Sequence, residues 1–143
     1  MLSRFYFTFG LACLTASGYA WAQCEQAHDL PRILCEVTYA GETQNIWACP
    51  TSEPYQVKAR NIRNRFQFKT YQTNASNLSP RIDIYVYQED VAEARLIQHV
   101  VIQPPYPTAK PNARVPLMGV QHLYAGPAER ELIYHCDIVG DKP

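Results

Sequence analysis

Glu131-Leu-Ile-Tyr-His-Cys-Asp-Ile-Val139 is the stretch of sequence that decides the fold. Apolar and polar residues alternate along it, which is the period of a half-buried β-strand. The alternation directs Cys136 toward the core and places His135 and Asp137 on the opposite face. The next cysteine upstream is Cys49, so a disulfide from Cys136 must reach a much earlier segment. We therefore predict that this strand ties the end of the domain to its beginning.

Residues 1–22 are typical of a secretory signal peptide. Arg4 supplies the positive charge, an apolar run follows it, and Ala20-Trp21-Ala22 matches a cleavage pattern with small residues at its ends. The apolar run is shorter than the roughly 20 residues that a membrane span needs, so we do not expect an integral membrane protein. We predict that residues 23–143 form one exported domain with a periplasmic or secreted location.

Four of the five cysteines lie in the predicted mature chain, at positions 24, 35, 49 and 136. An even number of cysteines in an exported chain favours two disulfides. No pair has the C-x-x-C spacing of a redox or zinc site. Cys35, like Cys136, lies on the more apolar face of its strand. We therefore predict that Cys35 pairs with Cys136 and that Cys24 pairs with Cys49.

Turn-forming residues separate eight short segments of strand period, and no segment has a convincing helical period. The predicted strands are 33–39, 42–49, 55–60, 65–71, 81–88, 95–102, 117–124 and 131–139. Ala40-Gly41 predicts a tight turn, and we expect the strand 95–102, which is apolar on both faces, to be central or covered. Seven or eight short strands predict an all-β, disulfide-stapled β-sandwich, immunoglobulin-like in the broad sense, or a partly open barrel.

A basic hairpin is the strongest functional signal in the sequence. The segments 55–60 and 65–71 alternate, and the loop 61–64 would pair Arg60 with Arg65. This register puts Phe66 and Phe68 on one face and the cations on the other. Tyr85 and Tyr87 extend the basic face if the strand 81–88 lies beside the hairpin. The predicted binding residues are Lys58, Arg60, Arg63, Arg65, Lys69, Tyr85 and Tyr87.

The basic face predicts a non-catalytic module that binds a protein or an anionic envelope polymer. The same face could also exist without a partner, because the acidic turn 89–93 could neutralise it or its charges could guard a sheet edge against aggregation. We do not expect nucleic-acid binding, because Phe66 and Phe68 point away from the cations and form no stacking platform. The whole chain has 13 basic and 13 acidic residues, and loss of Arg4 leaves 12 basic ones, so general electrostatic attraction to nucleic acid or membrane is excluded as well.

Two alternative functions remain open. A secreted inhibitor of a lysozyme or protease could insert a loop, either Asn61–Asn64 or the proline-rich segment 104–116, into a foreign active site. A hydrolase would need a pocket that holds at least two of His99, His122, His135 and Asp137. The sequence contains no motif for a catalytic residue, a metal or a cofactor, and we expect a monomer.

Overall fold

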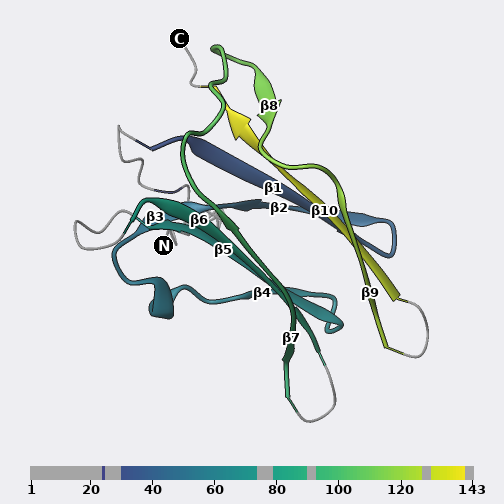
Figure 1. The fold of residues 1–143 in the computed structure, drawn as a ribbon. Coiled ribbons are helices and arrows are strands. Elements are labelled where there is room, and N and C mark those ends of the chain that lie inside the picture. Colours follow the sequence, from purple (N-terminus) through teal and green to yellow (C-terminus); the bar gives the residue numbers. More distant parts are fainter. Residues whose placement is uncertain (1–23, 25–29, 74–78, 90–92, 127–129, 141–143) are drawn as a thin grey trace, which may run out of the picture.

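The computed structural model describes residues 24, 30–73, 79–89, 93–126 and 130–140, so the predicted signal peptide lies outside the described residues. Two β-sheets face each other and do not close into a barrel, which confirms the predicted all-β sandwich (Figure 1). The strands are β1 (Arg32–Tyr39), β2 (Glu42–Trp47), β3 (Cys49–Thr51), β4 (Arg60–Ile62), β5 (Phe66–Thr73), β6 (Arg81–Gln88), β7 (Arg95–Ile102), β8 (Arg114–Pro116), β9 (Gln121–Ala125) and β10 (Arg130–Val139).

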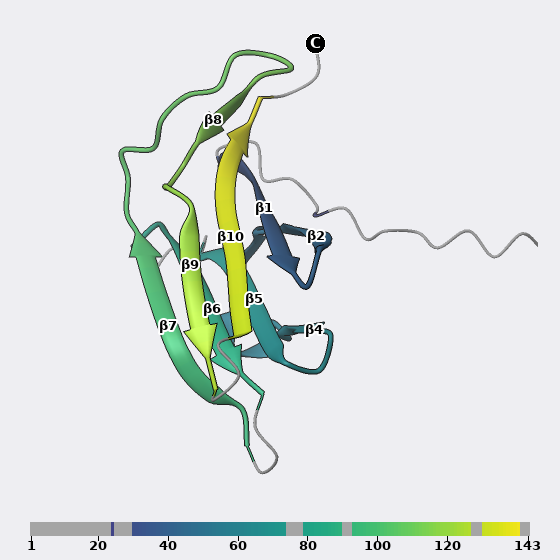
Figure 2. The same cartoon turned by 90° about the vertical axis from the view of Figure 1, so that its right-hand side faces the viewer.

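The closing strand, β10, is the centre of the first sheet. It pairs with the whole length of β1, and β1 pairs with β2. On its other side, β10 pairs first with β9 and then, at its end, with β8. Figure 2 shows β10 between β1 and these two strands. The strand predicted to fasten the fold is thus the one that contacts the most other strands of this sheet.

The hairpin of β1 and β2 has the predicted register. Ala40 and Gly41 both have positive φ, 52° and 78°, which suits the two-residue turn of a tight hairpin. Tyr39 pairs with Glu42, and Cys35 lies opposite Ile46. The chain then leaves the first sheet at Ala48 and enters the second as β3, a crossing that the sequence did not indicate.

The second sheet is built on β5, β6 and β7, which pair antiparallel in that order. The other edge of β5 is shared by two short strands, because β4 pairs with its first part and β3 runs parallel to its last part. β7 is an edge strand on which Leu96 and Val101 are 47% and 43% exposed. The expectation that it would be central or covered is therefore wrong.

The core lies between the two sheets and is lined by their inward-facing side chains. Two edge-to-face ring contacts join the sheets directly: Tyr39 to Phe66 at 5.3 Å and Phe68 to Tyr134 at 5.1 Å between centroids. Tyr134 is fully buried, and its hydroxyl donates a hydrogen bond to Oε1 of Gln98 at 2.5 Å. A buried tyrosine needs such a partner for its polar end.

The two disulfides have the predicted pairing, Cys35 with Cys136 and Cys24 with Cys49. Cys35 and Cys136 are fully buried and are direct partners of the β1–β10 ladder, with Cα atoms 4.0 Å apart. The central bridge thus joins two strands of one sheet, whereas that of an antibody domain joins two sheets. Two intramolecular disulfides indicate an oxidising, exported environment.

Candidate functional site

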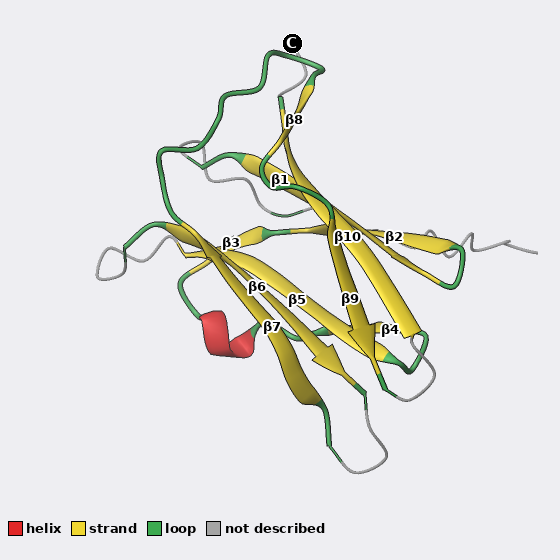
Figure 3. Cartoon of the chain, turned by 45° about the vertical axis from the view of Figure 1, so that its right-hand side comes forward, coloured by secondary structure: helices red, strands yellow, loops and turns green. Residues whose placement is uncertain are grey.

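The predicted basic hairpin has a different register in the structure. A 3₁₀ helix at Pro54–Gln56 replaces the start of the expected strand, and β4 begins only at Arg60 (Figure 3). Arg60 pairs with Phe68, not with Arg65. This is a shift of three residues, and an odd shift moves a side chain to the other face of the sheet. Ile62, expected in a loop, is buried at 1% exposure opposite Phe66, and its burial fixes the register.

The prediction of a single basic face is therefore wrong, because its residues lie on both faces of the second sheet. Arg60 shares the inner face with Phe68, at the edge of the sheet where side chains are exposed. Lys69, Tyr85 and Tyr87 lie together on the outer face, because β6 pairs with β5. Tyr55, which the predicted register places on the same face as Phe66 and Phe68, is 96% exposed.

Lys69 is held by an outer layer of aromatic rings. Its ammonium donates a hydrogen bond to the carbonyl of Pro54 at 3.0 Å and lies over the rings of Tyr71 and Tyr85. The hydroxyls of the two tyrosines are 3.2 Å apart. Burial and this hydrogen bond raise the pKa of Tyr71 above its ordinary value of 10.0. Tyr85 also stacks on Tyr87. These three predicted residues already have partners within the chain.

Asp83 alternates with the inward-facing Ile82 and Ile84 and so lies on the outer face of β6, yet it is fully buried within this outer layer. Nε of Arg81 donates to one carboxylate oxygen at 2.8 Å, and Nε2 of His99 lies 2.9 Å from the other. The hydrogen bond to Asp83 raises the pKa of Arg81. The ring of Tyr85 stacks on His99 at 4.1 Å between centroids. A buried carboxylate with both oxygens satisfied is a structural feature of this sheet.

The two cations at the turn of the hairpin differ, because Arg63 has an ion pair and the exposed side chain of Arg65 has none to a described residue. Arg63 forms an ion pair with Glu42 at 2.5 Å, which links the tips of the two hairpins. Arg65 lies beside the start of the acidic turn, because its carbonyl accepts a hydrogen bond from the amide of Glu89. The carboxylate of Glu89 accepts a second bond from Gln67 at 2.6 Å. The chain's own acid therefore lies next to this part of the predicted face.

Lys58 and Arg60, like Arg65, are exposed with no ion pair to any described residue. Both line a pocket of about 320 Å³ that opens between the two sheets. The lining residues come from β2, β3, β5, the start of β4 and the segment before it: Ile46, Trp47, Cys49, Pro50, Thr51, Val57, Lys58, Arg60, Phe68, Thr70 and Tyr71. This pocket with its two cations is the candidate functional site.

The pocket lies where the strand pairing along one edge of β5 is interrupted. β4 pairs with β5 as far as Phe68, and β3 pairs with it from Tyr71 onward. Lys69 and Thr70 therefore have a paired strand only on the β6 side. The connection from β3 to β4 passes around this gap through the 3₁₀ helix, shown in red in Figure 3.

Thr70 lies in the wall of the pocket and is only 5% exposed. Its hydroxyl is buried and has no hydrogen-bond partner among the described residues. An enclosed hydroxyl without a partner costs about 1–3 kcal/mol. The pocket thus combines apolar walls, one unsatisfied hydroxyl and two cations.

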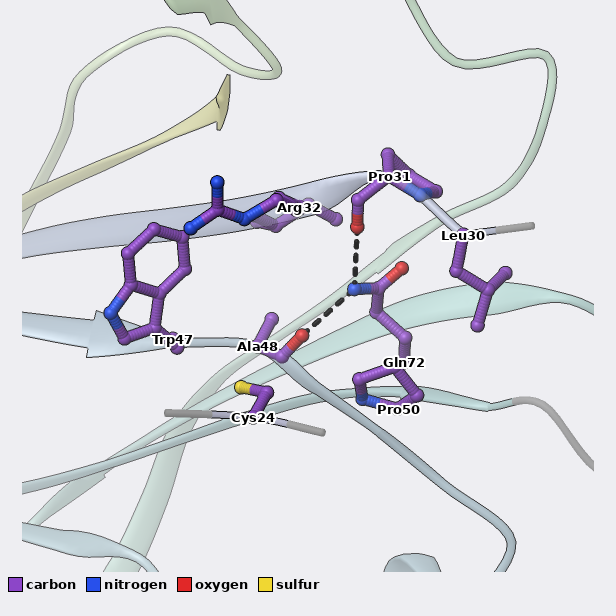
Figure 4. Close-up of a pocket in the computed structure, with 9 residues that line it drawn as sticks. Cys24, Leu30, Pro31, Arg32, Trp47, Ala48, Pro50 and Gln72 are labelled. Atoms are coloured by element: carbon purple, nitrogen blue, oxygen red, sulfur yellow. Dashed lines mark hydrogen bonds between the residues drawn. The ribbon is translucent and has the colours of Figure 1, made fainter. Parts of the chain in front are cut away.

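A smaller neighbouring pocket of about 70 Å³ surrounds Gln72 (Figure 4). The amide nitrogen of Gln72 donates to the carbonyls of Pro31 and Ala48, both at 2.8 Å. These bonds hold the start of β1 and the crossing between the sheets against β5. Arg32 lies over the ring of Trp47 at 5.1 Å. Gln72 is therefore a structural connector, and the cavity around it is small.

The histidines that a hydrolase would use do not converge. His99 is on the second sheet, whereas His122 is paired with Glu131 on the first sheet at 2.7 Å. Hydrogen bonds from His122 and Tyr124 lower the pKa of Glu131. His135 and Asp137 lie 3.9 Å apart on β10. Neither a histidine nor a carboxylate lines the pockets of about 70, 320 and 280 Å³ in the described part of the chain.

The proline-rich segment, one of the two candidate inhibitory loops, contacts the body of the protein. Tyr106 and Ala109 pack against the core. The carbonyl of Lys110 lies so close to Gly140 that a Cβ there would be 1.9 Å from it. The second candidate loop, 61–64, is mostly the short strand β4 and its turn.

Comparison of the chain with protein-family models, with curated proteins and with solved structures finds no match. No helix within the described ranges has the length and hydropathy to cross a membrane. In the same part of the chain, no three His, Cys, Asp or Glu side chains are grouped so that they could hold a metal ion.

Sequence reasoning found Lys58 and Arg60 but missed the residues around them. Trp47, Val57, Phe68 and Thr70 come from separate segments and share no motif. The exposed pair of cations was the only available signal, because the pocket depends on how β2 faces the β3–β4 connection.

Proposed function

We propose that this chain is an exported, non-catalytic binding protein of the periplasm or the secreted fraction, and that Lys58 and Arg60 contact an anionic partner. The observation that carries the proposal is the pocket: two exposed cations line it, and no acidic residue does. Like charges placed close together repel, and an anion between them relieves the repulsion. The partner is an anionic envelope polymer or an acidic protein surface.

The two cations could also protect a sheet edge without any partner. β4 is an edge strand, and lysine and arginine at sheet edges prevent strands of two molecules from pairing. Edge protection and partner binding differ in their consequences. Edge protection predicts aggregation when the charges are neutralised, whereas partner binding predicts a loss of affinity when they are reversed.

Charge reversal separates edge protection from partner binding. Lys58→Glu with Arg60→Glu keeps the edge charged but repels an anion. We expect the unaltered chain to bind at least one of immobilised lipopolysaccharide, teichoic acid or polyglutamate in biolayer interferometry at about 0.15 M salt, where charges are screened beyond about 8 Å. The double variant should bind at least about tenfold more weakly, which corresponds to about 1.4 kcal/mol.

The matched control is Lys110→Glu with Arg130→Glu, which changes the net charge equally but lies outside the pocket. Its affinity should stay within about twofold of that of the unaltered chain, since net charge alone acts weakly over such distances in salt. Equal losses in both double variants, or no binding by the unaltered chain to any of the three polymers, would contradict the proposal.

A further inference from the structure

The pocket beside Lys58 and Arg60 has the dimensions of a small-molecule site. Its volume of about 320 Å³ lies at the lower end of the range for ligand pockets, about 300–1,000 Å³. The pocket at Gln72 is several times smaller. The third pocket has a volume of about 280 Å³ and is lined by one cation, Arg32. The guanidinium of Arg32 already contacts the ring of Trp47, so it is less suited to hold an anion.

The walls of the pocket are suited to an apolar group. Ile46 of the first sheet and Val57 and Phe68 of the second side contribute apolar side chains. Phe68 is fully buried and contacts Tyr134 in the core, so the inner wall is continuous with the centre of the sandwich. Apolar surface removed from water here would contribute about 25 cal/mol per Å².

The polar groups of the pocket favour a ligand with an anionic head group. Lys58 and Arg60 offer N–H donors, and neither has an ion pair within the described residues. Thr70 adds a hydroxyl without a partner. Rotation about χ1 exchanges the hydroxyl and methyl groups of a threonine, so this hydroxyl can turn toward a ligand while the backbone stays in place.

We infer that this pocket binds a small amphiphilic anion, with an aliphatic or aromatic body against Ile46, Val57 and Phe68 and one carboxylate or phosphate head at Lys58 and Arg60. This inference rests on the proposed function, because both use the same two cations. It adds an enclosed apolar site that a polymer or protein surface does not require. Few apolar pockets with converging polar groups occur in a protein of this size.

Decanoate is a suitable probe for isothermal titration calorimetry on the full chain. We expect one molecule to bind per chain with a Kd below about 1 mM. Acetate, which has the head alone, and decyltrimethylammonium, which has the same chain with a cationic head, should bind at least about tenfold more weakly. Decanoate binding should also weaken at least about tenfold in Lys58→Glu with Arg60→Glu, and stay within about twofold in Lys110→Glu with Arg130→Glu.

Two further variants test the apolar walls and the hydroxyl of the pocket. Val57→Trp fills the apolar space beside Ile46 and Phe68 and should weaken decanoate binding at least about tenfold. Thr70→Val keeps the shape but removes the hydroxyl and should weaken it about threefold to tenfold, as expected for one hydrogen bond. Circular dichroism and melting temperature verify that each variant is folded. Should Val57→Trp unfold the chain, Val57→Phe takes its place.

The outcomes separate this inference from the proposed function. Loss of decanoate binding in Val57→Trp with unchanged polymer binding supports both. No decanoate binding by the unaltered chain, or equal affinity for decanoate and decyltrimethylammonium, overturns the inference and leaves polymer binding to be judged by its own assay. Decanoate binding by a chain that binds no polymer supports the pocket and overturns the polymeric partner.

Discussion

Tyr134 is the largest fully buried side chain of the described core, and it connects both sheets through its ring and its hydroxyl. Burial raises its pKa above the ordinary tyrosine value of 10.0. The folded protein therefore keeps the phenol proton at a pH where the unfolded chain has released it. Linkage then requires the free energy of unfolding to fall as pH rises above 10.

Tyr134→Phe tests this linkage. Between pH 10 and 12, the unaltered chain should lose stability more steeply than the variant, by up to about 1.4 kcal/mol per pH unit at 25 °C. The slope is read from urea unfolding at several pH values, and the smaller stability of the variant at neutral pH does not affect it. Tyr55→Phe, at a position that is 96% exposed, is the control and should leave the slope unchanged. If the free energy of unfolding fell equally steeply with pH in the unaltered chain and in both variants, the raised pKa would not belong to Tyr134.

At the scale of elements, the hairpin of β4 and β5 shows how one buried residue sets a register. Asn61 and Asn64 indicate a four-residue loop, but Ile62 between them enters the core opposite Phe66. The loop then contracts to a turn in which Arg63 and Asn64 take positive φ, 51° and 52°. The burial of an isoleucine, which is worth about 1.5–3 kcal/mol, offsets part of the cost of these two left-handed residues.

Ile62→Ala should therefore lower the free energy of unfolding by about 2–4 kcal/mol, the usual cost of a large-to-small change in a core. A residue in an exposed loop would change it by less than about 0.5 kcal/mol. Leu96→Ala is the matched control, since Leu96 is 47% exposed on the edge strand β7. Denaturant unfolding measures both variants, and similar small losses in the two would mean that Ile62 is not a core residue.

At the scale of the whole molecule, the two disulfides close loops of different length. Cys35 and Cys136 are separated by 101 positions, and Cys24 and Cys49 by 25. On the chain-entropy relation, loops of about 100 and 25 residues contribute about 4.7 and about 3.5 kcal/mol. The longer bridge is also fully buried, so replacing its sulfurs disturbs the packing of β1 on β10.

Cys35→Ala with Cys136→Ala should consequently destabilise the fold more than Cys24→Ala with Cys49→Ala. We expect losses of about 4–5 kcal/mol for the first pair and about 3–4 kcal/mol for the second, measured by denaturant unfolding. If the Cys24–Cys49 variant were the less stable one, then the shorter bridge would dominate, and the described start of the chain would contribute more to the fold than β1 and β10.

The sequence by itself determined the features that depend on local alternation. Period two identified β6 and β7 to the residue, directed Cys35 and Cys136 inward, and fixed the turn at Ala40 and Gly41. These features follow from which side of its own strand a residue occupies, and that information is contained in the neighbouring residues. Alternation was sufficient to predict the sandwich and the pairing of the cysteines.

Only the tertiary structure decided which other strand lies against each face and edge. Alternation did not reveal that β7 is at an edge, that Asp83 is covered by its neighbours, or that Ile62 enters the core. The pocket at Lys58 and Arg60 depends on the same missing information, because β2 of one sheet and the β3–β4 connection of the other form its walls. Burial depends on contacts between segments that are distant in the sequence. The candidate site could therefore be located only from the tertiary structure, because the periodicity of a single strand carries no information about those contacts.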